Sequence, residues 1–133
     1  MIGSYVLLME MSEEKTIRIG KRGQMLFSAG WYVYVGSAMN SIEKRVKRHF
    51  SKEKKHHWHI DYFLDEAKLI KAFYKENNVR EECIIAGLFA AECKSIPGFG
   101  SSDCSCDSHL FYANKKKLEW LIKNMGMNVL DAK

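Results

Sequence analysis

The chain has 133 residues, of which 47% are hydrophobic and 28% charged, a balance that predicts one globular domain over residues 1–133 and excludes a disordered chain. Its net charge of +5 is typical of proteins that bind a polyanion, although a cationic face can also be merely solvated. Because no stretch has the pattern of a secretory signal or a membrane span, we expect a cytoplasmic protein whose four cysteines are thiols or metal ligands and not disulfides.

Strands are predicted through most of the N-terminal third. Apolar, β-branched and aromatic residues mark them at 2–11, 16–19, 24–28 and 31–35. Glycines at 20 and 23 permit a tight reversal between the second and third of these segments. We therefore expect an antiparallel meander of three or four strands, whose last strand is interrupted at Gly36 and Ser37.

A basic amphipathic helix is predicted next. Asn40 is a candidate N-cap, with Glu43 three residues on as its reciprocal partner. Apolar residues recur every four positions and form a stripe for burial, namely Ile42, Val46 and Phe50. Polar and cationic residues fill the neighbouring positions, namely Lys44, Arg45, Lys47, Arg48 and His49. This face is suited to phosphate binding beside the glycine-interrupted strand.

The rest of the chain predicts alternating helices and strands. Helices are expected at 58–67, 81–93 and 115–125, the last with Asn114 as its cap and Gly126 as its stop. In the helix at 81–93 we expect Ile84, Ile85, Leu88 and Phe89 to point inward. Strands are expected at 69–74 and 110–112, separated by a loop at 95–108. The sum is a small α/β (α+β) domain, with a mostly antiparallel or mixed sheet flanked by three to four helices.

The stretch Tyr34-Val35-Gly36-Ser37-Ala38, followed by Glu43-Lys44-Arg45 and Lys47-Arg48-His49-Phe50, resembles the second half of the GIY-YIG nuclease signature. Further segments make the chain similar to the Uri-type branch of that superfamily, namely residues 3–5, 57–62, 82–83 and 98–104. The resemblance implies a GIY-YIG-like fold. It also implies a divalent-metal-dependent endonuclease that hydrolyses phosphodiester bonds of duplex or branched DNA, as in repair or recombination.

The resemblance also implies roles for individual residues. Tyr5 and Tyr34 would orient or deprotonate water, Arg45 would hold the phosphate, and Glu82 would ligate Mg²⁺ or Mn²⁺. His49 would hydrogen-bond a phosphate or shuttle a proton, and its competing interpretation is a half-buried helix histidine that packs beside Phe50. Each tyrosine could instead be an ordinary sheet residue, and Glu82 could simply favour a helix N-terminus.

One tyrosine assignment has a rival. Tyr5 is separated from Tyr34 by 28 intervening residues, a gap that a hairpin inserted between Ser12 and Gly30 would explain. In the rival registration Tyr32, on the same strand face as Tyr34, takes the role of Tyr5.

Further candidates for nucleic-acid contact lie around the motif and in two later segments. The set comprises Gly36, Ser37, Lys44, Arg48, His59, Asp61, Ser102 and His109, with Asp103 beside them in the loop. His59 and Asp61 flank an apolar position beside Trp58, which suggests base stacking with acid–base or ligand capacity. The alternative is that Trp58 anchors the helix and Asp61 helps to cap it.

Cysteines in the loop offer soft metal ligands. Cys104, Cys106 and His109 form a Cys-x-Cys-x-x-His pattern, and Cys83 or Cys93 could complete a zinc site. The spacing matches no standard zinc finger, so a pocket-lining loop without metal, or cysteines acting as small buried hydrophobes, are the alternatives. Three functions follow from the whole sequence: an endonuclease, a non-catalytic nucleic-acid-binding module of the same fold, or a zinc-stabilised interaction domain.

Overall fold

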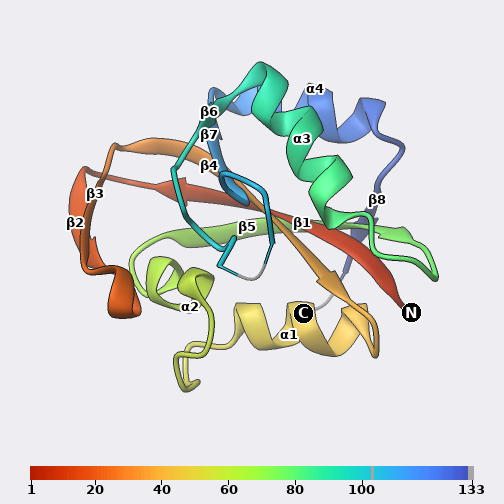
Figure 1. Cartoon of the computed structure of the whole chain (residues 1–133), viewed down its shortest axis with the longest axis horizontal. Helices are drawn as coiled ribbons and strands as arrows, with labels where there is room; N and C mark the ends of the chain where they lie inside the picture. The colour runs from red at the N-terminus through yellow and green to blue at the C-terminus, as the bar shows by residue number, and fades with distance from the viewer. Residues whose placement is uncertain (103, 132–133) are drawn as a thin grey trace.

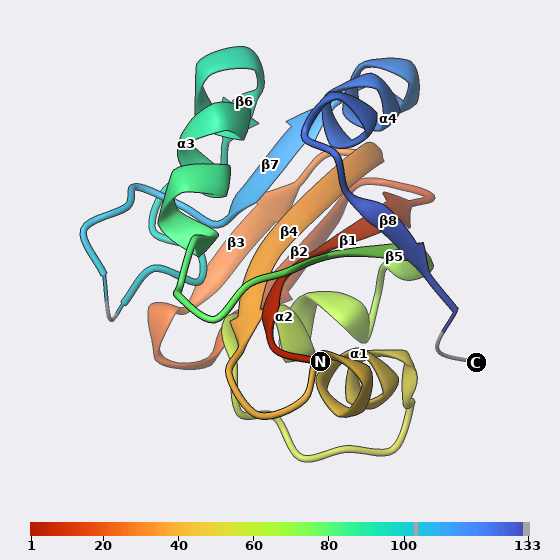
Figure 2. The same cartoon turned by 90° about the vertical axis from the view of Figure 1, so that its right-hand side faces the viewer.

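The computed structural model describes residues 1–102 and 104–131 and places an antiparallel sheet between two layers of helices (Figures 1 and 2). The strands are β1 (Gly3–Met11), β2 (Lys15–Arg18), β3 (Gln24–Phe27), β4 (Gly30–Ala38), β5 (Lys68–Glu76), β6 (Lys94–Ser95), β7 (Leu110–Ala113) and β8 (Asn128–Leu130). The helices are α1 (Ile42–Phe50), α2 (His59–Leu64), α3 (Glu82–Glu92) and α4 (Lys115–Asn124), and a short 3₁₀ turn, η1, spans Gly20–Arg22. Within the described residues, no helix has both the length and the apolar character needed to cross a membrane.

The large sheet has six strands in the order β6-β7-β4-β1-β5-β8, and each neighbouring pair is antiparallel. This confirms the predicted fold class. The expected meander is wrong in one respect, because β2 and β3 pair only with each other and form a separate two-stranded sheet. They are therefore a hairpin inserted between β1 and β4, as the gap between Tyr5 and Tyr34 predicted.

The sheet buries apolar side chains on both of its faces. On β1, Tyr5, Leu7 and Met9 join the core beneath α1 and α2, whereas Val6 and Leu8 join the core beneath α3 and α4. All five are at most 1% exposed, because β1 lies in the middle of the sheet and is covered on both sides. Figure 2 shows the two helical layers on opposite sides of the strands.

Strand β4 is longer than the sequence predicts. It continues through Gly36 and Ser37 to Ala38, because β1 pairs with it in unbroken register from Gly3↔Ala38 to Met11↔Gly30. Glycine does not end the strand here but makes room for a neighbour. A Cβ atom at Gly36 would overlap the ring and hydroxyl of Tyr5, which is its partner in the register.

The boundaries of two helices differ from prediction. Ser41, and not Asn40, caps α1, since its Oγ accepts a hydrogen bond from the backbone amide of Lys44 at 3.1 Å. Glu43 is engaged elsewhere and pairs with the N-terminal amine of Met1 at 2.7 Å. Helix α2 ends at Leu64 and does not reach residue 67. The Asn114 cap of α4 is confirmed, and Gly126 follows that helix with a positive φ of 73°.

Helix α3 faces the sheet with a different side from the one predicted. Ile85 and Phe89 are buried as expected, together with Ala86. Ile84 and Leu88 point outward instead and are 66% and 50% exposed. Apolar residues on several sides of this helix leave its inward side to be decided by the fit against β4 and β1.

A buried carboxylate joins the first two helices. Asp61 is fully buried and accepts two hydrogen bonds from the guanidinium of Arg48, at 2.8 and 3.1 Å. The backbone amides of His57 and Trp58 donate to the same carboxylate at 2.7 and 2.9 Å. Although burial opposes ionisation, the bonds from Arg48 and from these amides lower the pKa of Asp61. The carboxylate therefore caps α2 and fastens it to α1.

Loss of this carboxylate should destabilise the fold. We expect Asp61→Asn to lower the free energy of unfolding by about 3 kcal/mol, because Arg48 then loses its charged partner at a buried site. The matched control is Asp65→Asn, which removes an exposed carboxylate paired with His56 and should cost less than about 1 kcal/mol. Urea unfolding followed by circular dichroism measures both, and equal losses in the two variants would contradict the structural role of Asp61.

Candidate functional site

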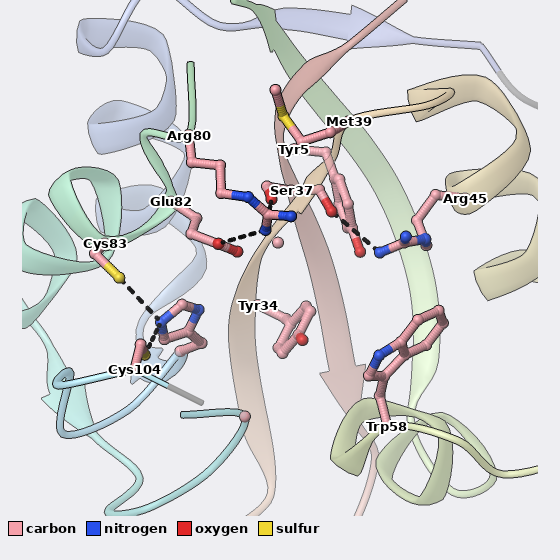
Figure 3. Close-up of a pocket in the computed structure, with 13 residues that line it drawn as sticks. Tyr5, Tyr34, Ser37, Met39, Arg45, Trp58, Arg80, Glu82, Cys83 and Cys104 are labelled. Atoms are coloured by element: carbon pink, nitrogen blue, oxygen red, sulfur yellow. Dashed lines mark hydrogen bonds and ion pairs between the residues drawn. The ribbon is translucent and has the colours of Figure 1, made fainter. Parts of the chain in front are cut away.

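A pocket of about 640 Å³ opens at the edge of the sheet where β4 loses its outer neighbour. Strand β7 pairs with β4 only from Trp31 to Tyr34, and beyond that point the backbone amide of Val35 donates to the carbonyl of His109 at 2.9 Å. Side chains from both helical layers reach this gap (Figure 3). The described residues that line it are Tyr5, Tyr34, Gly36, Ser37, Met39, Arg45, Trp58, Arg80, Glu82, Cys83, Gly100, Cys104 and His109.

Two tyrosines form the floor of the pocket. Tyr5 on β1 and Tyr34 on β4 point to the α1 side of the sheet, and both are at least nine-tenths buried. Burial raises the pKa of each phenol above its usual value, and for Tyr5 the charge of Arg45 opposes this rise. Both phenols are therefore protonated at neutral pH. The rival Tyr32 is directed elsewhere, with its hydroxyl donating to the carbonyl of Ser28 at 2.7 Å.

His49 lies behind the pocket and contacts Tyr5. Its ring is 2% exposed, and Nε2 is 2.8 Å from the Tyr5 hydroxyl. Burial is the largest cause that lowers the pKa of His49, to about 3, so the ring is neutral at physiological pH. A direct contact with phosphate, one of the roles considered from the sequence, does not fit this position. His49 instead fixes the orientation of the Tyr5 phenol.

Arg45 enters the pocket from α1. Its Nη1 donates to the backbone carbonyl of Ser37 at 3.0 Å, and its guanidinium lies 4.5 Å from the ring centre of Trp58. Arg48 contacts the same indole ring at 4.6 Å. Because the strand carbonyl and the indole both hold it, Arg45 presents a pre-oriented positive charge on one wall.

Glu82 and Arg80 form the opposite wall. Helix α3 covers the other face of the sheet, but its N-terminal end lies beside the open edge of β4, so both side chains reach the pocket. Arg80 Nη1 lies 3.5 Å from the Glu82 carboxylate and 3.4 Å from the hydroxyl of Ser37. The pocket thus combines two guanidinium groups, one carboxylate and two phenols.

Sequence reasoning missed Arg80. A signal was present, because an arginine just before a helix N-terminus meets the positive end of the helix dipole and is electrostatically unfavourable there. Trp58 was considered for base stacking, and the structure places it where it can stack on both Arg45 and Arg48.

Several predicted nucleic-acid contacts take other positions. Asp61 is fully buried and its hydrogen bonds are used within the protein, so the direct contact expected of it is wrong, and the alternative of a helix cap is correct. The guanidinium of Arg48 donates two hydrogen bonds to the carboxylate of Asp61. His59 Nδ1 accepts a hydrogen bond from the backbone amide of Gly100 at 2.9 Å and so holds the loop that lines the pocket. Lys44 and Ser102 are exposed on α1 and in the loop. Asp103 lies outside the described residues.

Beside Glu82 is a group of three thiols and an imidazole that can hold a metal ion. The ligand atoms of Cys83, Cys104, Cys106 and His109 all lie within 4.8 Å of one another. Of the two candidate fourth ligands, Cys83 joins the group, whereas Cys93 at the end of α3 packs against the core beneath α3 and α4. A hydrogen bond with Cys106, together with burial, raises the pKa of Cys83 to about 12.

The chain belongs to the protein family described as "Domain of unknown function DUF123", whose model matches residues 4–129. Comparison with curated proteins and with solved structures gave no match.

The burial of His49 makes fold stability depend on pH. Folding lowers the pKa of His49 from 6.5 to about 3, so the folded state favours the neutral ring over the protonated one. The contribution of this preference to the free energy of unfolding is complete above pH ~6.5 and is lost as the pH falls toward 3. Between about pH 7.5 and about pH 5 we expect wild type to lose about 2 kcal/mol of unfolding free energy through this residue. His49→Gln should lack that loss in urea titrations at the two pH values. His57→Gln, at an exposed position, should keep it, and an unchanged pH dependence in His49→Gln would contradict this origin.

Proposed function

We propose that this protein is a divalent-metal-dependent endonuclease that hydrolyses DNA phosphodiester bonds at a GIY-YIG-type site, in the manner of the Uri-type branch that its sequence resembles. One observation carries the proposal: Tyr5, Tyr34, Arg45 and Glu82, which lie far apart in the sequence, line the same pocket. Its volume of about 640 Å³ is ample for a phosphodiester and its adjoining sugars. If these four side chains served only to pack the fold, nothing would require them to meet in one pocket.

The residues of the pocket fit a hard divalent cation that is completed by substrate. Glu82 is the single carboxylate among the described lining residues, and its side chain is 23% exposed. Mg²⁺ and Mn²⁺ are commonly held by one or two carboxylates, with phosphate oxygens and water filling the other positions. Glu82 would therefore hold the ion in the presence of DNA. When bound, the ion neutralises phosphate charge and stabilises the leaving oxygen.

The chain's own groups supply binding and alignment. Arg45 and Arg80 approach from opposite walls and would hold the nonbridging phosphate oxygens, where negative charge increases in the transition state. Tyr34 and Tyr5 would hydrogen-bond the attacking water and the phosphate from the floor. His49 restrains Tyr5 through the 2.8 Å hydrogen bond, so the phenol keeps one direction into the pocket.

Protonated phenols act here as orienting groups and not as free bases. Their raised pKa values mean that ionisation needs added positive charge, which Arg45 and a bound cation would supply. A basic surface for the remaining DNA backbone starts at Arg45 and continues over exposed Lys44 and Lys47 on α1. This surface would hold the strand on either side of the phosphate in the pocket.

Cleavage should depend on the pocket and not on charge alone. With Mg²⁺ or Mn²⁺, we expect wild type to nick duplex or branched DNA, and Arg45→Ala and Glu82→Gln to lower the rate constant by about 10²–10³-fold, because each removes a group that acts at the phosphate. The matched control is Lys116→Ala, which removes the same charge from an exposed position on α4, away from the pocket and the basic surface of α1, and should change the rate less than about threefold. Intact duplex, branched and single-stranded substrates across a metal panel would refute the enzyme.

DNA binding should persist when cleavage is blocked. In the absence of divalent metal, Glu82→Gln should bind duplex DNA with an affinity that falls as salt rises, with a log–log slope of about −0.9 for each phosphate neutralised. Lys44→Ala should reduce that slope by about one unit, since it removes one exposed cation beside the pocket. Fluorescence anisotropy from about 50 to 200 mM salt measures the slope. Binding with no turnover would favour the non-catalytic module, and salt-insensitive binding would contradict both hypotheses.

A further inference from the structure

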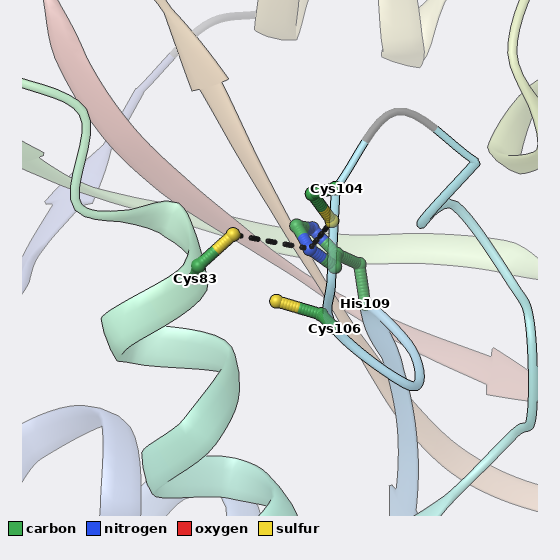
Figure 4. A group of neighbouring side chains, drawn as sticks. All are labelled: Cys83, Cys104, Cys106 and His109. Atoms are coloured by element: carbon green, nitrogen blue, oxygen red, sulfur yellow. Dashed lines mark hydrogen bonds between the residues drawn. The ribbon is translucent and has the colours of Figure 1, made fainter.

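The three thiols and the imidazole beside the pocket come from two separate segments of the chain (Figure 4). Cys83 lies in the first turn of α3, whereas Cys104, Cys106 and His109 lie in the loop between β6 and β7. Figure 4 shows the four side chains pointing toward one another across the space between helix and loop. Any ion bound at their centre would therefore join α3 to the loop.

The distances suit a tetrahedral ion. His109 Nε2 is 3.4 Å from Cys104 Sγ and 4.0 Å from Cys83 Sγ, and the four ligand atoms all lie within 4.8 Å of one another. In a tetrahedral zinc site with Zn–S bonds near 2.3 Å and Zn–N bonds near 2.0 Å, ligand atoms lie about 3.5–3.8 Å apart. The separations of 3.4 and 4.0 Å lie on either side of this range, and even the longest, at no more than 4.8 Å, would have to shorten by only about 1 Å.

The orientation of His109 also favours a metal ligand. Its ring is 3% exposed, and Nδ1 lies 3.0 Å from the backbone carbonyl of Val35. Because a carbonyl oxygen can only accept, Nδ1 carries the proton and Nε2 presents its lone pair to the sulfur atoms. A backbone carbonyl that fixes the tautomer in this way is the usual second partner of a zinc-binding histidine. A buried histidine that merely fills space would not need its free nitrogen aimed at two thiols.

We propose that Cys83, Cys104, Cys106 and His109 bind one Zn²⁺ in a closed tetrahedral site that fastens the loop to α3 and so positions Glu82. Three thiolates and an imidazole select zinc over Mg²⁺ and Mn²⁺, which prefer oxygen ligands. Four protein ligands leave no open position for water, so this ion is structural and separate from the cation held by Glu82.

The position of Cys83 connects the ion to the pocket. Glu82 precedes Cys83 directly, so a metal bond to the cysteine restrains the backbone that carries the carboxylate. On the loop side, Gly100, Cys104 and His109 all line the pocket. The ion thus holds the residues of one wall of the pocket in place, and Arg45 lies on the opposite wall. This effect on Glu82 rests on the proposed nuclease function, whereas the zinc site itself does not.

Metal content tests the site directly. Protein purified without chelator should contain about one zinc per chain by elemental mass spectrometry, both in wild type and in Cys93→Ser. Cys93→Ser is the matched control, because it removes the remaining cysteine of the chain, which lies outside the group. Cys106→Ser and Cys104→Ser should lose most of the zinc. No zinc in wild type, equal loss in Cys93→Ser, or a disulfide among these cysteines in freshly purified protein would overturn the proposal.

A second measurement avoids variants that fail to fold. Cobalt added to metal-free wild type should give the strong visible absorption of tetrahedral Co²⁺ together with a sulfur-to-metal charge-transfer band, and zinc should abolish both. Octahedral cobalt absorption without a sulfur band would contradict the ligand set, whatever the variants do.

The restraint that the ion places on the backbone of Glu82, here called the clamp, can be measured separately by hydrogen exchange. Removing zinc with a zinc-selective chelator in excess Mg²⁺ should increase hydrogen exchange in the first turn of α3 and in residues 96–102 and 104–109, and zinc should restore protection. Unchanged exchange would overturn the clamp. Zinc bound with no cleavage of any DNA would refute the nuclease and leave the zinc site standing. Cleavage by protein that was purified without chelator and contains no zinc would refute the zinc site and leave the nuclease standing.

Discussion

The contact between Tyr5 and Gly36 is the constraint on which the pocket depends. The unbroken pairing of β1 with β4 sets these two residues opposite each other, and the aromatic ring occupies the space that any side chain at position 36 would need. Glycine therefore leaves the space beside β4 that the Tyr5 ring occupies, and the phenol reaches His49 on α1. The sheet, the first helix and the pocket floor are thereby fixed relative to one another by one close approach.

The second constraint is the short length of β7. It pairs with β4 only as far as Tyr34, and one further hydrogen bond joins Val35 to His109. Among the described residues, β4 therefore has no outer strand beside it from Gly36 to Ala38. Groups from opposite faces of the sheet can meet only at such an edge, because the strands separate them everywhere else. Arg45 arrives from the α1 layer, and Arg80 and Glu82 arrive from the α3 layer. The result is a pocket that is lined from both layers and carries charges of both signs.

Much of this arrangement was accessible from sequence, and the rest depended on long-range fit. Strand β1 and helix α4 with its Asn114 cap follow from local patterns. The motif residues Tyr34 and Arg45 follow from resemblance to a family signature, and the inserted hairpin follows from the gap before Tyr34 in that resemblance. By contrast, the partner of Asp61 lies 13 residues away on another helix, so no local pattern predicts a buried ion pair there.

Helix α3 shows a related limit of periodicity. Its apolar residues surround the axis, which indicates a helix but not its inward side, and Ile84 therefore points to solvent against expectation. Arg80 was missed for a different reason, because its signal, one cation at the positive end of a helix, is a single residue and not a periodic pattern. The grouping of Cys83 with the loop cysteines likewise required knowing which end of α3 approaches the sheet edge.

The inserted hairpin lengthens the chain between β1 and β4 without moving these two strands apart in space. Strands β2 and β3 leave the sheet and return to it between β1 and β4, yet the pairing of those two strands is unbroken. Loop closure costs free energy only logarithmically with length, so segments of very different size could be spliced at this point without moving the two phenols apart. A search that demands a fixed spacing between the two halves of such a motif would pass over chains built this way.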